Sequence, residues 1–190
     1  NLKDDYKQIM SSLTNMIPVD GVDVVMCNFV IHYFMDTPVH ARNVIYLIKE
    51  LLKPGGHFFM TAFSGEAIFN LLKEGSWIAR EGEVLKYSIN KDYTSNVLEP
   101  TGQQINLILP FSAGKHYTEY LVNFDYLLSE FEINGFEIVR TGSFKEYIPE
   151  LKSDRKLTAD DEKFVSLYSY AVVRKKDTEN DTEVKREKTG

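Results

Sequence analysis

The segment Asp23–Phe34, with the sequence DVVMCNFVIHYF, carries the strongest structural signal in the chain. It overlaps a dense apolar run, Val22–Phe29, of the kind that forms a buried parallel strand. The run then continues into an amide, aromatic rings and a histidine in Asn28–Tyr33. Ligands of open α/β sheets bind beyond the carboxyl ends of the strands. The segment therefore predicts a ligand-binding edge where its polar and aromatic residues begin.

A helix and a second strand are predicted after this segment. Thr37 and Pro38 are typical of a helix N-cap and a first helical position. The apolar residues that follow with helical spacing are Val39, Val44, Ile45, Leu47, Ile48, Leu51 and Leu52. Lys53–Gly56 (KPGG) ends the helix, and His57–Ala62 (HFFMTA) predicts another buried strand. This order of elements is typical of half of a doubly wound α/β sheet.

The remaining chain also alternates between helix and strand signals. Helices are predicted at Ser64–Lys73, Asn123–Glu132 and Leu157–Phe164, and strands at Phe136–Thr141 and Ser166–Val173. Gly82–Leu109 differs, because its alternation predicts short antiparallel strands. We interpret residues 1–175 as one domain with an insertion at about 76–118. Lys176–Gly190 is almost wholly polar and is predicted to be a charged, disordered tail.

Composition narrows the function classes. The 190 residues suffice for one domain with a sizeable core. A net charge of −6 argues against non-specific nucleic-acid binding but allows one nucleotide to be recognised in a pocket. The single cysteine, Cys27, excludes a disulfide framework and fits a reducing compartment. We expect no metal site, because the histidines lack metal-ligand spacing, and no membrane span, because no apolar run approaches ~20 residues.

Several motifs, taken in order, resemble the mRNA cap guanine-N7 methyltransferases, particularly those of large DNA viruses. The first is an apolar strand with Cys27–Phe34 (CNFVIHYF), followed by a helix and Leu52–Gly56 (LKPGG). The others are Tyr117–Val122 (YTEYLV) and Leu167–Val173 (LYSYAVV). The resemblance covers roughly Val22–Lys175. It implies a Rossmann-like, class I S-adenosylmethionine-dependent methyltransferase fold.

The resemblance also implies roles for individual residues. It assigns Asn28, Phe29 and Tyr33 to the methyl donor. It assigns the cap guanine to Phe29, His32, Tyr33, Glu119 and Tyr168. His32 and Glu119 would act by alignment and electrostatics, and no residue would act as a general acid or base. Asn28 replaces the glutamine of the family, and Ala62-Phe63 replaces a Thr-Pro pair whose contact we therefore do not assign.

The glycine-rich, acidic turn that holds the donor in such enzymes is not found in this sequence. Gly21 is the only glycine before Gly55. We therefore expect the N-terminal βαβ units to be absent from this chain and activity to need a longer one. Two alternatives remain open: a methyltransferase for a small metabolite, and a non-catalytic, methyltransferase-like scaffold or subunit.

The same resemblance implies the partners and the compartment. S-adenosylmethionine would be the methyl donor, and the capped 5′ end of mRNA would be the substrate. Other capping-enzyme domains or a stimulatory subunit are further expected partners. The expected location is intracellular, in the nucleus, or in the cytoplasm or virion if the protein is viral.

Overall fold

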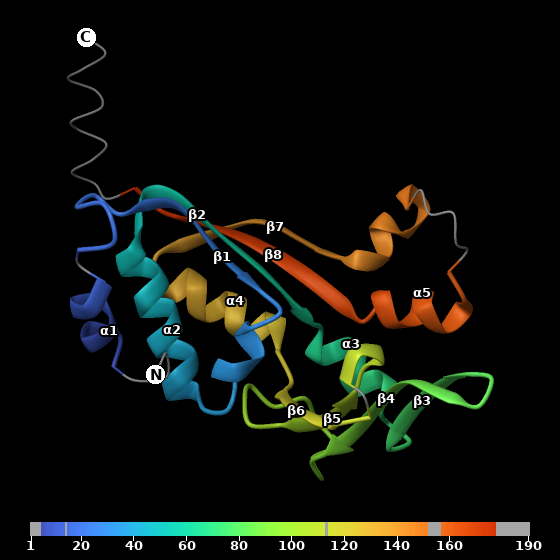
Figure 1. The fold of residues 1–190 in the computed structure, drawn as a ribbon. Coiled ribbons are helices and arrows are strands. Elements are labelled where there is room, and N and C mark those ends of the chain that lie inside the picture. The colour runs from blue at the N-terminus through green and yellow to red at the C-terminus, as the bar shows by residue number, and fades with distance from the viewer. Residues whose placement is uncertain (1–4, 14, 113, 152–156, 178–190) are drawn as a thin grey trace.

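The computed structural model describes residues 5–13, 15–112, 114–151 and 157–177 of the chain. Its main sheet contains, in spatial order, β1 (Val22–Asn28), β2 (Leu52–Phe63), β8 (Tyr168–Lys175) and β7 (Phe136–Ser143). β1 runs parallel to β2, whereas β8 is antiparallel to both β2 and β7. The sheet is long and twisted (Figure 1), and β8, the last strand among the described residues, lies inside it.

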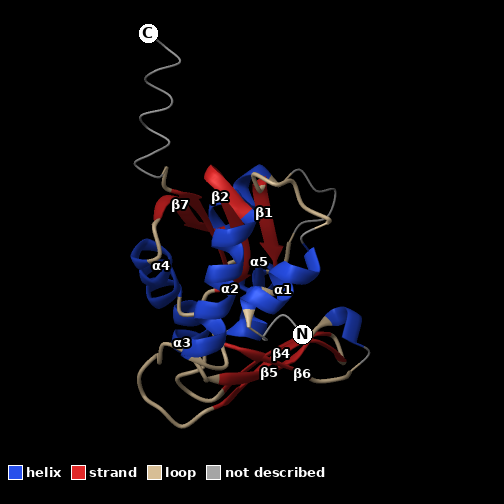
Figure 2. Ribbon diagram, turned by 90° about the vertical axis from the view of Figure 1, so that its left-hand side faces the viewer, coloured by secondary structure: helices blue, strands red, loops and turns tan. Residues whose placement is uncertain are grey.

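The helices α1 (Tyr6–Leu13), α2 (Pro38–Leu51) and α4 (Phe124–Ile133) lie together on one face of this sheet (Figures 1 and 2). α2 begins as predicted, because the Thr37 side chain accepts a hydrogen bond from the His40 N–H at 3.2 Å. The Asn123 side chain caps α4 in the same way. α2 lies against β1 and β2, and α4 lies against β7.

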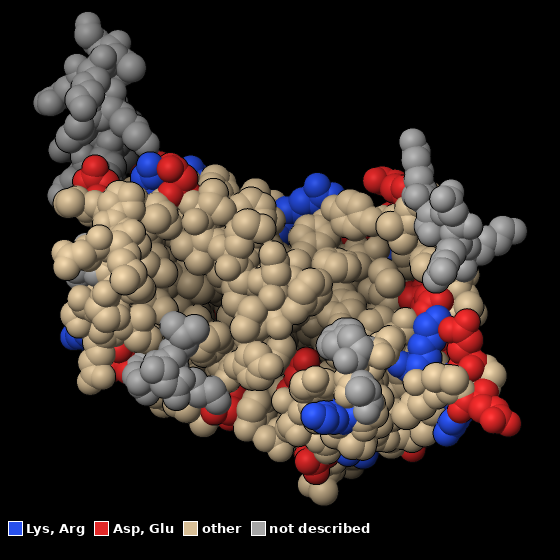
Figure 3. Space-filling model, in the orientation of Figure 1, with Lys and Arg blue, Asp and Glu red and all other residues tan. Residues whose placement is uncertain are grey.

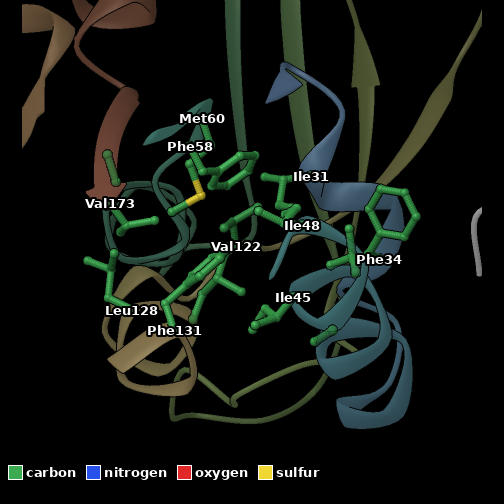
Figure 4. Packing of buried hydrophobic residues seen from close by; sticks show 14 of the residues in the cluster. Ile31, Phe34, Ile45, Ile48, Phe58, Met60, Val122, Leu128, Phe131 and Val173 are labelled. Carbon is green, nitrogen blue, oxygen red and sulfur yellow. The ribbon is translucent and has the colours of Figure 1, made fainter. Parts of the chain in front are cut away.

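The main core lies between these helices and the sheet. Phe58 and Met60 of β2 point toward Ile45 and Ile48 of α2, and Phe131 of α4 stacks on Phe58 at 5.3 Å between centroids (Figure 4). Burying one such side chain contributes about 1.5–3 kcal/mol. Phe58, Met60 and Ala62 are buried on the face of β2 that packs against helices, whereas the residues between them are only partly buried.

β1 is parallel to β2, as predicted, but the prediction that it is buried is wrong. Val25 and Cys27 pack on the main core, whereas Val24 and Met26 point the other way and remain 48% and 64% exposed. β1 is an edge strand of the four-stranded sheet formed by the described residues. The consecutive apolar residues of β1 therefore point alternately to a face that packs on the core and to a face that is exposed.

A second, antiparallel sheet contains β3 (Ser76–Glu81), β4 (Val84–Asp92), β5 (Gln104–Ile108) and β6 (Tyr117–Tyr120). It packs with α3 (Gly65–Leu71) around a smaller core that includes Ile68, Ile89 and Leu107. The antiparallel strands predicted within Gly82–Leu109 are confirmed. The two sheets meet where the Gly65 N–H donates to Val122 O at 2.8 Å.

The C-terminal third adds two elements beside the sheets. The 3-10 helix η3 (Phe144–Glu150) follows β7 and was not predicted, and α5 (Ala159–Val165) lies within one residue of the predicted helix Leu157–Phe164 at its C-terminal end and is capped by Thr158. Asp161 of α5 accepts hydrogen bonds from Lys86 Nζ at 3.0 Å and from Tyr87 Oη at 2.8 Å. α5 is thereby tied to β4 of the antiparallel sheet.

Two further expectations concern the tail and membranes. Of the predicted tail 176–190, only residues 176 and 177 are described, and the Lys176 N–H donates to Gly135 O at 3.0 Å. Residues 178–190, which make up the rest of the tail, lie outside the described residues. No helix within the described ranges is long and apolar enough to cross a membrane.

Candidate active site

A cavity of about 540 Å³ opens between the main sheet and the antiparallel sheet. Its walls come from segments that are distant in the sequence: the end of β1, the 3-10 helix η1 (Ile31–Phe34), β6, η3, α5 and the start of β8. The lining residues are Phe29, His32, Tyr33, Leu109, Tyr117, Glu119, Phe144, Phe164, Val165 and Tyr168. Figure 3 shows this side of the molecule, where charged side chains gather mostly around the margin of an uncharged, hollowed centre.

The chain turns sharply into this cavity at Phe29. Phe29 has a φ of +56°, a left-handed conformation that bulky residues rarely adopt. The turn ends β1 and starts η1, which brings His32 and Tyr33 to the cavity wall with their rings 4.1 Å apart. The conformation of one residue thus converts the end of a strand into a ligand-facing wall.

His32 and Glu119 form the polar centre of the cavity. His32 Nδ1 lies 3.5 Å from Glu119 Oε2, and the side chains are 6% and 16% exposed. Burial lowers the pKa of His32 to about 4 and raises the pKa of Glu119 to about 7. The imidazole is therefore neutral near pH 7, and its Nδ1–H is able to donate to the carboxylate. His32 Nε2 has no hydrogen-bond partner among the described residues.

Aromatic rings form most of the remaining wall. Phe29 meets Tyr168 edge to face at 5.2 Å, and Phe144 lies 5.8 Å from Tyr168. Phe164 of α5 contacts Tyr168 at 5.5 Å and stacks on Tyr87 of β4 at 4.1 Å. Burial also raises the pKa of the Tyr168 hydroxyl, which therefore stays protonated. These rings present flat apolar surfaces beside one carboxylate, as expected for the recognition of an aromatic heterocycle.

Five of the six site residues named from the sequence line this single cavity: Phe29, His32, Tyr33, Glu119 and Tyr168. Asn28 is exposed beside it, and its Oδ1 accepts a hydrogen bond from Thr61 Oγ1 at 3.3 Å. Sequence reasoning missed the lining residues Leu109, Tyr117, Phe144, Phe164 and Val165. Tyr117 stands inside the motif YTEYLV and offered a signal, whereas Phe144 follows a strand without any distinguishing pattern.

The described part of the chain has no group of three or more His, Cys, Asp or Glu side chains that could hold a metal ion. The Cys27 thiol lies at the main core, and burial raises its pKa to about 11. The partly buried side chain therefore disfavours the reactive thiolate form.

Comparison with known proteins decides the family. A profile of the mRNA (guanine-N(7))-methyltransferase domain matches residues 3–185. The chain belongs to this family. The resemblance inferred from the motifs is thereby confirmed over their whole span.

Related capping proteins include both viral and cellular members of the family. An mRNA-capping enzyme of African swine fever virus is 38% identical over 169 residues, which are 83% of this chain and 20% of that protein. An mRNA cap guanine-N(7) methyltransferase of Saccharomyces cerevisiae is 31% identical over 133 residues, 66% of this chain and 30% of that protein. The chain thus spans about a fifth of the viral relative and under a third of the yeast one.

Solved structures confirm the fold class of this family member. An S-adenosylmethionine-dependent methyltransferase from Clostridium acetobutylicum superposes with a TM-score of 0.51 at 12% identity, covering 90% of this chain and 69% of that one. The CcbJ methyltransferase from Streptomyces caelestis gives the same TM-score at 16% identity, covering 84% and 59%. The α/β fold is therefore that of the class I methyltransferases.

Proposed function

We propose that this protein transfers the methyl group of S-adenosylmethionine to N7 of the guanosine cap of mRNA. The observation that carries the proposal is the buried carboxylate of Glu119, held beside His32 among aromatic rings. Family membership supplies the reaction class, and the names of the viral and yeast relatives agree with it. The shape and polarity of the cavity explain why guanine would be the nucleobase that is bound.

Guanine fits the chemistry of this cavity. Its Watson–Crick edge presents two adjacent donors, the N1–H and an N2–H, to a carboxylate acceptor such as Glu119. Its ring system would lie against Phe29 and Tyr168, whose rings line the cavity. Adenine presents only one donor group and an acceptor on the corresponding edge. Glu119 would therefore favour guanine over adenine.

The donor side of the cavity also fits the chemistry of a sulfonium compound. Asn28, Phe29 and Tyr33 lie at the carboxyl end of the parallel strand β1, where ligands of such sheets bind. The faces of Phe29 and Tyr33 suit a cationic sulfur, because aromatic rings attract cations electrostatically. These three residues would hold the donor against the guanine side of the cavity.

The reaction needs alignment more than proton transfer. When bound, the donor supplies a methyl group on a sulfonium; N7 bonds to the carbon with its own lone pair, and the S–CH₃ bonding electrons stay on sulfur. N7 carries no proton, so no residue has to act as a general base. Phe29, His32 and Tyr168 would fix the base in line and exclude water, and such positioning is worth up to about 7–11 kcal/mol.

Glu119 would contribute to the chemical step itself. As the purine gains positive charge during transfer, a carboxylate hydrogen-bonded to N1 and N2 is increasingly favoured. Neutral His32 would hold Glu119 through Nδ1, at the observed 3.5 Å. The role of His32 is then to orient the carboxylate and to complete the wall, and it loses no proton.

The test is methyl transfer by the full-length protein from labelled S-adenosylmethionine to GpppA-capped RNA. Digestion to the cap should release labelled 7-methylguanosine. ApppA-capped RNA and free GTP serve as matched substrates that vary the base and remove the RNA. Label on a free metabolite but not on capped RNA would favour a small-molecule methyltransferase. Failure to bind the donor at all would favour a non-catalytic scaffold.

The partners and the location follow from the proposed reaction. The substrate would be the capped 5′ end of a transcript, and the work would take place inside the cell, in the nucleus, or in the cytoplasm or virion for a viral protein. Relatives named mRNA-capping enzymes are several times longer than this chain, which supports association with other capping domains.

A further inference from the structure

Phe29 is the most strained residue at the site and needs an external restraint. It is the only residue other than glycine with positive φ among those described. Such a conformation costs on the order of 1–3 kcal/mol and persists only where surrounding contacts enforce it. Its side chain is 49% exposed, so packing alone gives little restraint. The hydrogen bonds of its backbone therefore decide how well it is held.

Those bonds lead to one residue, Thr61 of β2. The Phe29 N–H donates to Thr61 O at 2.8 Å and to Thr61 Oγ1 at 3.2 Å. Because Asn28 and Thr61 are paired across the parallel strands, the same hydroxyl also reaches the preceding side chain. Thr61 Oγ1 donates to Asn28 Oδ1 at 3.3 Å. One hydroxyl thus accepts from the backbone of Phe29 and donates to the amide of Asn28.

We propose that Thr61 is a positioning residue of the methyl-donor site, acting through Asn28 and Phe29 without touching the ligand. Within the described part of the chain, Thr61 does not line the cavity. The inference rests on the proposed function only in that Asn28 and Phe29 are taken to face the donor.

The hydroxyl controls two properties of the site. It adds a second acceptor for the Phe29 N–H and so stabilises the left-handed turn that aims the Phe29 ring at the cavity. It also orients the Asn28 amide, since Oδ1 faces Thr61 and the Nδ2 donors face away. Without it, the amide is free to rotate by 180° and to present an acceptor where a donor is needed.

The experiment compares Thr61→Val, which keeps the shape and removes the hydroxyl, with Thr61→Ser, which keeps the hydroxyl. Binding of S-adenosylhomocysteine to the full-length protein is measured by calorimetry, with melting temperature as a check on folding. Thr141→Val, at an exposed threonine of β7 in the same sheet, is the matched control. Thr61→Ala replaces Thr61→Val if the latter does not fold.

Thr61→Val is expected to weaken binding about fivefold, the loss that corresponds to one net hydrogen bond, while Thr61→Ser and Thr141→Val stay within about twofold of wild type. A crystal structure of Thr61→Val should show Phe29 with negative φ or Asn28 with its amide rotated. Wild-type affinity in Thr61→Val, or equal losses in Thr61→Val and Thr61→Ser, would overturn the proposal.

Failure of the proposed function is recognised separately in this experiment. Wild-type protein that binds S-adenosylhomocysteine but leaves capped RNA unmethylated would refute the cap reaction and still allow the Thr61 comparison. Wild-type protein that binds no S-adenosylhomocysteine would overturn both, because Thr61 would then have no donor site to support.

Discussion

The substitution Glu119→Gln tests the assignment of the cavity most directly. In the proposed complex the carboxylate accepts two hydrogen bonds from guanine, whereas the amide accepts one and turns its own N–H groups toward the other donor. Hydrogen bonds to a charged partner are worth about 1.5–3 kcal/mol each. The loss of one bond and of the charge should therefore cost about 3 kcal/mol, or roughly a 150-fold fall in kcat/KM for capped RNA.

The same substitution should stabilise the fold at alkaline pH. The pKa of Glu119 is about 7 in the folded protein, whereas the ordinary value of 4.5 applies in the unfolded chain. The folded protein therefore holds the proton more tightly. The free energy of unfolding of wild type therefore decreases as pH rises from 4.5 through 7, because the ionised carboxylate is buried. At pH 8 the buried charge lowers the free energy of unfolding by about 3 kcal/mol. Glutamine carries no charge and is free of this loss.

The assay combines methyl transfer to GpppA-capped RNA with urea unfolding at pH 5 and pH 8. Glu50→Gln, on the exposed surface of α2, is the matched control and should change neither property. Lower activity with higher stability at pH 8 is the expected pair of results. Unchanged kcat/KM would refute the role of Glu119 in binding guanine, and lower activity caused by unfolding would refute the argument from burial.

Four further predictions concern other contacts. KM for capped RNA should fall as pH rises through about 7, because ionised Glu119 is the acceptor; a flat profile from pH 6 to 8 would contradict this. His32→Ala should retain its circular dichroism spectrum while kcat/KM falls at least tenfold, and loss of the spectrum would indicate a structural role instead. Phe164→Ala should lower the free energy of unfolding by about 3 kcal/mol in urea, because it removes the stack on Tyr87, whereas a loss below 1 kcal/mol would mean that the stack is loose. Gly65→Ala should lower the melting temperature strongly, since the added Cβ would lie 2.6 Å from Val122 O. A normal melting temperature would show that the backbone around Val122 shifts to make room for the methyl group.

The local elements were predictable because their signals are local. Thr37 and Pro38 determine the start of α2 through capping chemistry, and Thr158 does the same for α5. The site residues on one segment, Phe29, His32 and Tyr33, followed from their position at a strand end. Glu119 and Tyr168 were found only through motifs of a known family, since no local pattern links them to that segment.

The features that were missed depend on tertiary contacts. The exposure of Met26 depends on which face of β1 meets helices, and an apolar residue has the same sequence signature on either face. Phe144 joins the cavity because β7 delivers η3 beside Tyr168, a contact between elements that the sequence does not relate. The left-handed turn occurs at Phe29 and not at a glycine, so the sequence contains no signal for it. Each of these depends on how the elements pack together and not on the residue types alone.

The position of β8 within the main sheet also governs the order in which the molecule is completed on the ribosome. β8 pairs with both β2 and β7, so the two halves of the sheet stay unjoined until β8 has been synthesised. At ordinary translation rates β2 waits roughly ten seconds with that side unpaired. Tyr168, at the start of β8, closes the cavity in the same event. A nascent chain therefore gains its sheet and its proposed guanine pocket together, and a premature stop before Tyr168 would remove both at once.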